Sequence, residues 1–300
     1  MKVTTCVLPL YCLLITSGYS FLVAPVLLSV RNKVSSKVGK VSNNFVLNLS
    51  ADPIMVRSFT DAVTVNSGLA LLLTAVKQKS LTKIGLLHAT ILGIGLWTYL
   101  GFGGWITCVS YLIMGSAVTK VRMKEKERLG IAEKRGGARG PENVWGSAAT
   151  AMVCAILTYI LPSSFGPPLK VGYVASLATK LSDTFGSEIG KAFGKNTYLI
   201  TTMRTVPRGT EGAVSVEGTL AGVVGSIILS YIAAYLGLIN FKTDIITCIF
   251  AAFVATTAES FIGAVFQSDK YLWLTNELVN LINTIIGAVT AILLKVFINN

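Results

Sequence analysis

The 300-residue chain has little charge and a single histidine. Only 13% of its residues are charged and 52% are hydrophobic, and the mean hydropathy is +0.66. A typical soluble domain is about 25% charged, so this composition excludes an ordinary soluble protein. Apolar runs long enough to span a bilayer, which takes roughly 20 residues, recur along the chain.

The sequence also lacks the common motifs of soluble catalysts. It contains no Walker-type phosphate loop, no Gly-x-Ser-x-Gly elbow and no His-Glu-x-x-His zinc motif. His88 lies alone within an apolar run, and we expect it to be a hydrogen-bonded packing residue. The cysteines show neither metal-ligand spacing nor a disulfide framework: Cys6, Cys12, Cys108, Cys154 and Cys248.

Acidic residues are scarce relative to basic ones. The chain has 26 Lys and Arg against 14 Asp and Glu, a net charge of +12. In a membrane protein this surplus indicates the positive-inside bias and contact with anionic lipids, with a phosphate-bearing substrate as the second interpretation. No soluble domain carries a basic face interleaved with aromatic residues, so nucleic acid is not an expected partner.

The N-terminal region has the pattern of a targeting sequence. Residues 1–20 resemble a signal peptide, and residues 21–55 are Ser-rich and basic, with no acidic residue before Asp52. With Phe21 at the junction, the two segments resemble the bipartite presequence of algae with complex plastids. We therefore expect an integral protein of the plastid (chloroplast) envelope or inner membrane. The alternative is a first transmembrane helix with a basic tail.

The remaining residues, 56–300, are predicted to form an all-α polytopic transmembrane helical bundle with about seven spans (six to eight). A "GFGG" turn at 101–104 separates the second span from the third. The loops 77–83, 120–142, 191–211 and 267–277 are predicted to share one membrane face, the stromal one, because most loop charge falls there. The expected spans are 60–76, 84–101, 103–119, 145–162, 169–189, 213–239 and 245–266, with an eighth apolar stretch at 278–298.

Ionisable residues interrupt this apolar chain at "SDTFGSEIGKAFGK", residues 182–195. Asp183 and Ser187 are four residues apart and share a helix face, whereas Glu188 points elsewhere. An acid near the membrane face, followed by glycines and by Lys191 and Lys195, favours a metal-bridged phosphate. Close packing of a small-residue stripe is the alternative explanation of Gly186, Gly190 and Gly194.

A second polar segment, "RTVPRGTEGAVSVEGTLAG", covers residues 204–222. Arg204 and Arg208 flank a break in regular structure, and we interpret them as ligands of phosphate oxygens. Glu211 and Glu217 would join Asp183 in holding Mg²⁺, with Ser215 on the face of Glu211. A purely structural ion-pair network is the alternative.

Two further patches lie nearer the C-terminus. Glu259 falls within a predicted span, in "TTAESFIGAVFQ". In "TNELVNLINT", Asn276, Asn280 and Asn283 recur along one helix stripe. Such a stripe faces protein or water rather than lipid, so it either lines a substrate site or forms hydrogen bonds between helices.

Four of these segments, "SDTFGSEIG", "VPRGTEGAVSVEGTLAG", "AESFIGAVFQ" and "TNELVNLINT", occur in the order found in a known family. Over about residues 60–298 the chain resembles the plant phytyl phosphate kinase family of the vitamin E pathway, which has archaeal and animal relatives. Asp183, Ser187 and Glu211-Gly212 are more distantly similar to CTP-dependent polyprenol and dolichol kinases. The segment "RGPENVWGSAA" at 139–149 matches only partly, so Asn143 is given no role.

The resemblance implies a membrane-embedded kinase that forms phytyl diphosphate from phytyl phosphate and a nucleoside triphosphate, with CTP and Mg²⁺ expected. It implies phytol salvage for tocopherol and phylloquinone synthesis, with phytol kinase as a functional partner; the oligomeric state is left open. A cytidylyltransferase forming a CDP-lipid, a transporter of anionic substrates and a purely structural membrane protein are the alternatives. The candidate residues are Asp183, Ser187, Glu211 and Ser215 for catalysis, Lys191, Lys195, Arg204, Arg208, Asn276 and Asn280 for substrate phosphates, and Asp183, Glu188, Glu217 and Glu259 for metal.

Overall fold

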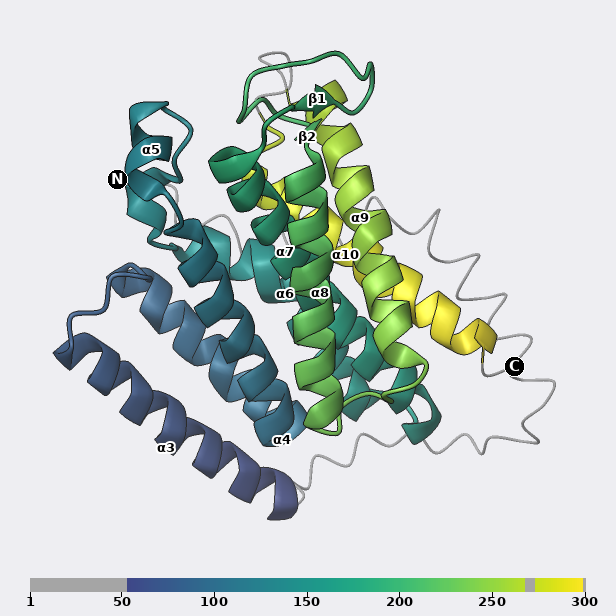
Figure 1. Ribbon diagram of the computed structural model, residues 1–300. Coiled ribbons are helices and arrows are strands. Elements are labelled where there is room, and N and C mark those ends of the chain that lie inside the picture. Colours follow the sequence, from purple (N-terminus) through teal and green to yellow (C-terminus); the bar gives the residue numbers. More distant parts are fainter. Residues whose placement is uncertain (1–52, 268–272, 299–300) are drawn as a thin grey trace. The chain divides into compact units, whose positions relative to one another are not determined.

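The computed structural model describes residues 53–267 and 273–298 (Figure 1). The predicted signal-like segment and all but the last three residues of the transit-like segment lie outside this range. The helices are α3 (Pro53–Ala75), α4 (Lys83–Thr119), α5 (Met123–Arg128), α6 (Pro141–Ile160), α7 (Gly166–Phe193), α8 (Val216–Tyr235), α9 (Asp244–Phe266) and α10 (Asn276–Ile298). Two 3₁₀ turns, η1 (Lys134–Gly137) and η2 (Ser163–Phe165), and two short strands, β1 (Tyr198–Leu199) and β2 (Ala213–Val214), complete the elements.

Helix α4 is a hairpin of two antiparallel arms, 83–100 and 102–119. Gly101 breaks it with φ +66° and ψ −164°, a conformation that glycine adopts without the strain of a Cβ atom. Arg139 packs against both arms. A Cβ atom added to Gly85 would clash with the carbonyl oxygen of Arg139, and a Cβ atom added to Gly115 would lie 2.6 Å from the Arg139 guanidinium. In a straight helix these two glycines would be about 45 Å apart. The predicted turn at 101–104 is therefore confirmed.

The protein is an all-helical membrane protein, as predicted. Within the described residues five helices, α4, α6, α8, α9 and α10, are long and apolar enough to cross a bilayer, and the hairpin makes α4 two spans. The more polar α3 and α7 have 23 and 28 residues, which is also sufficient length. The described residues thus supply six to eight spans, which is the predicted range.

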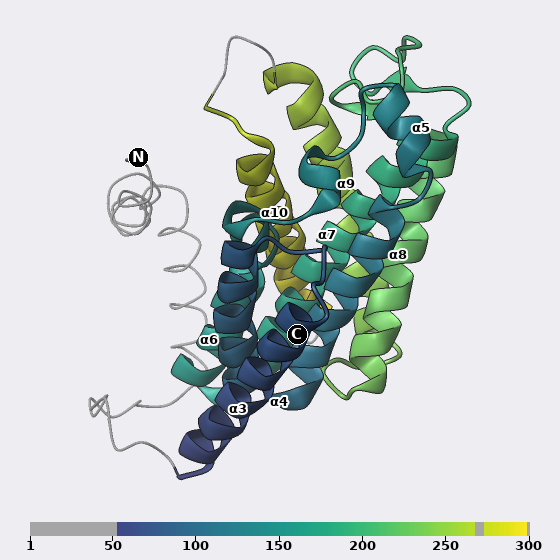
Figure 2. The same ribbon diagram turned by 90° about the vertical axis from the view of Figure 1, so that its left-hand side faces the viewer.

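Helix α7 lies at the centre of the bundle and packs against α4, α6, α8, α9 and α10 (Figures 1 and 2). Tyr173, Val174, Leu177 and Leu181 of α7 are completely buried. The Tyr173 hydroxyl donates a hydrogen bond of 2.6 Å to the carbonyl oxygen of Gly104 in the α4 turn. A helix surrounded by protein can carry polar groups that lipid would not tolerate, and this position explains the polar second half of α7.

The predicted basic loops meet at one end of the bundle. The Thr82 amide donates to the Arg139 carbonyl at 3.0 Å, Arg122 donates to the Ala192 carbonyl at 3.1 Å, and Gln267 donates to Asn276 at 2.6 Å. The first two contacts join the 76–82 loop to the 120–140 loop, and the 120–140 loop to the end of α7. The larger cavity at this end is lined by Glu133, Gly209, Gln267 and Thr275, so the 120–140, 194–215 and 267–275 loops meet there. The sparsely charged loops meet at the other end, where Gly103 packs against Leu236.

His88 has a structural role, as predicted. Its Nδ1 accepts a hydrogen bond of 2.9 Å from the indole of Trp145, and the two rings pack edge to face with centroids 6.3 Å apart. This contact ties the first arm of α4 to α6.

Candidate active site

Two cavities with charged side chains in their walls lie at the loop end of the bundle, with volumes of about 370 and 690 Å³. The smaller lies among α7, α8, α9 and the 194–215 loop, and the larger among α7, α10 and the 130–139 loop. They share one wall, so that they meet along the polar face of α7. The shared residues are Asp183, Ser187, Lys191, Gly209, Glu211, Glu259 and Gln267.

Helix α7 supplies the central row of this wall. Lys180, Asp183, Ser187 and Lys191 follow at spacings of three and four residues, which places them on one helix face. Lys180 donates a hydrogen bond to Asp183 and another of 2.6 Å to Asn280 on α10. Its side chain is 10% exposed and that of Asp183 is 21% exposed. Asp183 therefore has a buried cation on one side and the cavities on the other.

A second carboxylate, Glu259 of α9, lies beside Asp183. The two carboxyl groups are within hydrogen-bonding reach of each other, and Asn283 of α10 donates to Glu259. Two carboxylates this close repel each other unless a cation or a proton lies between them. Among the described residues no group of three or more His, Cys, Asp and Glu side chains could hold a metal. Mg²⁺, however, is commonly held by one or two carboxylates with substrate phosphates, and this pair suits that arrangement.

Glu211 faces the same wall from the loop between α7 and α8. This loop is shaped by the pairing of β1 with β2, Tyr198 opposite Val214, and by Gly212, whose φ of +72° lets the chain lie directly against α9. Burial, together with the charges of Asp183 and Glu133, raises the pKa of Glu211, and Lys191 offsets this only in part.

Lys191 and Glu188 belong to an ion-pair network beside the cavity. Glu188 pairs with Lys126 of α5 and, at 3.3 Å, with Lys191. Lys191 also pairs with Glu133 at 3.1 Å. Burial alone would raise the pKa of Glu133, but the charge and the hydrogen bond of Lys191 lower it on balance. An ion-pair network is thus formed by Glu188, Glu133 and these lysines, whereas the structural alternative drawn from the sequence concerned the glutamates and arginines of 204–222.

The predicted phosphate ligands differ in their positions. Arg208 lines the smaller cavity, donates to the carbonyls of Lys191 and Ala192 at 3.4 Å each, and lies 3.8 Å from Glu125. Asn276 and Asn280 line the larger cavity. Lys195 and Arg204 are exposed and line neither cavity.

Of the two predicted serines, Ser187 lines both cavities and donates to the Thr184 carbonyl at 3.3 Å. Ser215 lines the smaller one and caps α8, accepting from the Gly218 amide at 3.1 Å. Glu217 lines neither cavity and accepts from the Lys195 amide at 3.3 Å. The structure therefore brings together ten of the predicted residues: Asp183, Ser187, Glu188, Lys191, Arg208, Glu211, Ser215, Glu259, Asn276 and Asn280.

The glycine stripe of α7 packs closely against α8 beside this site. A Cβ atom on Gly218 would lie 2.6 Å from the carbonyl oxygen of Gly186 and 3.3 Å from the Cα atom of Gly190. Both glycines of α7 also line the smaller cavity. The stripe is thus a packing seam whose edge exposes backbone to the cavity.

Sequence reasoning missed several residues of the site. Lys180, Glu133 and Arg139 line the larger cavity, and so does Asn143, which the partial motif match had left without a role. Lys180 could have been found, since it precedes Asp183 by three residues on the same helix face and is a lysine inside an apolar run. Glu133, Arg139 and Asn143 lie in or just after a long charged loop, where the sequence offers no periodic pattern to single them out.

Comparison with known proteins finds relatives of the chain in a plant, a cyanobacterium and an archaeon. It is 54% identical over 231 residues to an uncharacterized membrane protein of Synechocystis, covering 77% of this chain and 89% of the relative. It is 41% identical over 267 residues to Protein VTE6, chloroplastic, of Arabidopsis thaliana, covering 88% and 79%. It is 34% identical over 219 residues to an uncharacterized membrane protein of Methanocaldococcus jannaschii, covering 73% and 87%.

No solved structure matches the chain. The family model described as integral membrane protein DUF92 matches residues 66–288, a range that includes all thirteen candidate residues from Asp183 to Asn280. The plant and archaeal relatives confirm the resemblance drawn from the four motifs. The chain belongs to the integral membrane protein family DUF92.

Proposed function

We propose that this protein is a membrane-embedded kinase that transfers the γ-phosphoryl group of a nucleoside triphosphate, with CTP as the expected donor, to a prenyl monophosphate such as phytyl phosphate. The observation that carries the proposal is the pair of cavities meeting at Asp183, Glu211 and Glu259. Two phosphorylated substrates could approach this shared wall from opposite sides. The motif resemblance and the chloroplastic plant relative support the same activity.

The linings suit different substrates. The smaller cavity exposes the backbone of Gly186, Gly190 and Gly218 next to Arg208, so a polyphosphate could approach the main chain closely. The larger cavity contains Arg135, Arg139 and Lys180, which suits the acceptor phosphate. We assign the nucleotide to the smaller cavity and the acceptor to the larger one.

In the proposed reaction an oxygen of the acceptor phosphate attacks the γ-phosphorus. The bond from that phosphorus to the oxygen bridging it to the β-phosphate breaks, which releases CDP and leaves prenyl diphosphate. Phosphoryl transfer depends mainly on positioning and on stabilising negative charge. Because the attacking oxygen already belongs to a phosphate, the reaction needs no strong general base, which agrees with the absence of His88 from the linings of both cavities.

Mg²⁺ would be held by Asp183 and Glu259, with Glu211 facing them, and would neutralise the donor phosphates. Lys191 and Arg208 would position the same phosphates, and Ser187 could donate a hydrogen bond. This set of metal ligands differs from the one predicted from the sequence at two positions. Glu188 is already paired with two lysines, and Glu217 lies outside the cavities, so neither is given a metal role.

We place this activity in a plastid membrane, with the basic loops toward the stroma. The presequence pattern, the loop charges and the plant relative support this location. The reaction would then follow a phytol kinase and serve phytol salvage for tocopherol and phylloquinone. The acceptor's tail would stay at membrane depth while its phosphate reached the loop end of the bundle.

Product analysis tests the proposal. The protein in lipid nanodiscs is given phytyl phosphate, CTP and Mg²⁺, and the products are resolved by mass spectrometry. We expect phytyl diphosphate and CDP, a requirement for Mg²⁺, and a loss of about 100-fold or more in turnover for Asp183→Asn. Glu127→Gln, an exposed acid on α5, is the matched control.

Other products would contradict the proposed reaction. A CDP-lipid with pyrophosphate would identify a cytidylyltransferase. Binding of phytyl phosphate without turnover by any nucleoside triphosphate would favour a transporter.

A further inference from the structure

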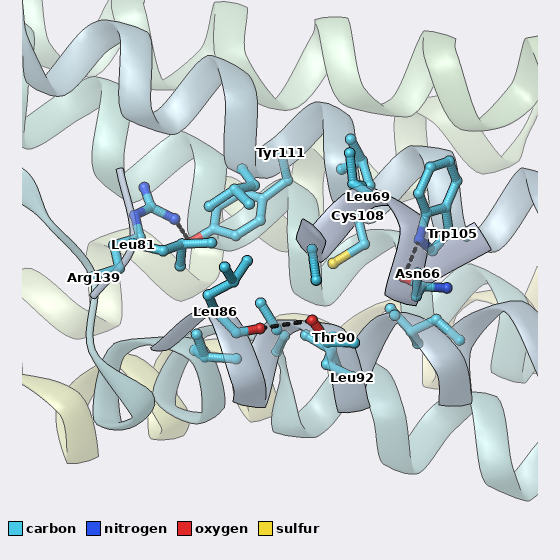
Figure 3. Close-up of a pocket in the computed structure, with 18 of the residues that line it drawn as sticks. Asn66, Leu69, Leu81, Leu86, Thr90, Leu92, Trp105, Cys108, Tyr111 and Arg139 are labelled. Atoms are coloured by element: carbon cyan, nitrogen blue, oxygen red, sulfur yellow. Dashed lines mark hydrogen bonds between the residues drawn. The ribbon is translucent and has the colours of Figure 1, made fainter. Parts of the chain in front are cut away.

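An apolar pocket of about 90 Å³ lies between α3, the two arms of α4 and the start of α6. Its lining is mostly Leu, Ala and Val, and polar groups occupy its ends (Figure 3). At one end the Trp105 indole donates to Asn66 at 2.9 Å. At the other end Arg139 donates to the Tyr111 hydroxyl at 2.8 Å. We call this pocket the apolar slot.

The Arg139 end of the apolar slot adjoins the larger polar cavity. Tyr111, Arg139, Asn143 and Ser147 line both spaces. An apolar space at membrane depth therefore meets a polar space at the loop end, and a guanidinium lies at their boundary. An amphipathic molecule with an apolar tail and an anionic head group matches this arrangement of an apolar space next to a cation.

Arg139 is held firmly at the boundary by its backbone and ring contacts. Its amide donates to the Ser80 carbonyl and its carbonyl accepts from the Thr82 amide, both at 3.0 Å. Its guanidinium lies 5.1 Å from the centroid of the Tyr111 ring. The contacts fix both the main chain and the charged group.

The guanidinium has spare hydrogen-bonding capacity. In the part of the chain that the structure describes, none of the ion pairs includes Arg139. A guanidinium presents five N–H donors in a planar fork that matches phosphate oxygens. A fixed cation without an acidic partner, at the mouth of an apolar space, is suited to an anionic lipid head group.

We propose that the apolar slot receives the isoprenoid tail of a lipid monophosphate and that Arg139 binds its phosphate. The inference rests on the proposed function and deepens it, because it assigns the acceptor's binding site. The phosphate at Arg139 lies in the cavity that also contains Asp183 and Glu259. Its free oxygens can therefore face the donor side.

The tail has a route from the bilayer between α3 and α4. Helix α3 packs chiefly against α4 at the edge of the bundle (Figure 2), with Leu71 and Leu72 of its outer face 73% and 59% exposed. Leu69 and Leu73 of its inner face and Leu86 of α4 line the slot. A slot of this volume encloses part of a C20 chain, and the remainder would pass out along the α3–α4 seam.

Photocrosslinking tests the site without requiring turnover. The wild-type protein in nanodiscs is exposed to phytyl monophosphate carrying a diazirine on its tail, and the labelled peptides are sequenced by mass spectrometry. We expect labels on slot residues such as Leu69, Cys108 and Leu112, reduced at least tenfold by excess unlabelled phytyl monophosphate. Uncompeted labels, or competed labels on α8 or α9, would overturn the inference.

Affinity measurements test the head-group contact. Arg139→Gln should weaken binding of phytyl monophosphate at least tenfold and leave CTP binding within twofold of wild type, while Arg139→Lys keeps part of the affinity. Lys79→Gln, an exposed cation in the adjoining loop, is the matched control. Unchanged lipid binding by folded Arg139→Gln would overturn the assignment. Competed slot labelling without phosphoryl transfer would support the slot and reject the kinase, so the two failures are distinguishable.

Discussion

Lys126 of α5 and Glu188 of α7 form an ion pair in which each side chain is only 1% exposed. Lys126 also donates to the Thr119 carbonyl at 2.7 Å, so one ammonium group joins the end of α4, α5 and α7. The pair fixes the start of the 120–140 loop, which continues into the wall of the larger cavity.

Removing one partner of this pair should destabilise the protein strongly. Lys126→Ala would leave Glu188 charged, buried and deprived of its main partner, at an expected cost of about 3–5 kcal/mol in the free energy of unfolding. The double variant Lys126→Met/Glu188→Gln should recover most of this loss because no buried charge is left unpaired. Thermal unfolding in detergent measures both, with the exposed Lys124→Ala as control. Equal losses in the single and double variants would contradict this account of the pair.

Glu133 should make stability depend on pH. Lys191 lowers the pKa of Glu133 below 4.5 against the opposing effect of burial, so the ionised form is favoured in the folded state. Its contribution is present above pH 4.5 and is lost as the pH falls through the folded-state pKa. Glu133→Gln should therefore lower the melting temperature at pH 7, with a smaller difference from wild type at acid pH. A difference independent of pH would show that the pair does not act through this charge.

Ionisation of Glu211 should determine how kcat/KM falls at acid pH. Burial and the neighbouring acids raise its pKa above 4.5, and we propose that its ionised form assists Mg²⁺ and phosphate binding. The value of kcat/KM should then fall as the pH drops through this raised pKa. Glu211→Gln should lower kcat/KM about tenfold or more at neutral pH and remove that fall. A variant that kept the wild-type profile would exclude the role.

The seam between α7 and α8 should not accept added atoms. Gly218→Ala would place a methyl group 2.6 Å from the Gly186 carbonyl, and such overpacking costs about 1–3 kcal/mol. Gly68→Ala meets nothing within 4 Å and should be neutral or slightly stabilising. The two melting temperatures in detergent compare the sites directly, and equal values would argue against a tight seam.

Local patterns in the sequence predicted much of the fold. Apolar runs predicted the spans. The glycines at 101–104 predicted the hairpin turn, which the structure places at Gly101. Charge bias between loops predicted which loops meet. The extent of α3 was underestimated, because it begins at Pro53 within the segment interpreted as targeting sequence.

The site was harder to predict because its connections are long-range. Helical spacing placed Asp183 and Ser187 on one face correctly, yet nothing local indicates that Glu188 pairs with Lys126, 62 residues away. Similarly, Glu217 and Glu211 look equivalent in sequence, but only Glu211 lines the cavities. Arg139 acquires its position from Ser80 and Thr82, which belong to another loop.

The most direct test of phosphoryl transfer is to follow a radioactive phosphate from CTP into the lipid product. The protein in nanodiscs is supplied with phytyl phosphate, Mg²⁺ and CTP labelled with ³²P at either the γ or the α position, and the lipid fraction is counted. We predict label in the lipid from γ-labelled CTP and none from α-labelled CTP, with the γ signal lost in Asp183→Asn. Lipid label from the α position, or none from any nucleoside triphosphate, would contradict the account.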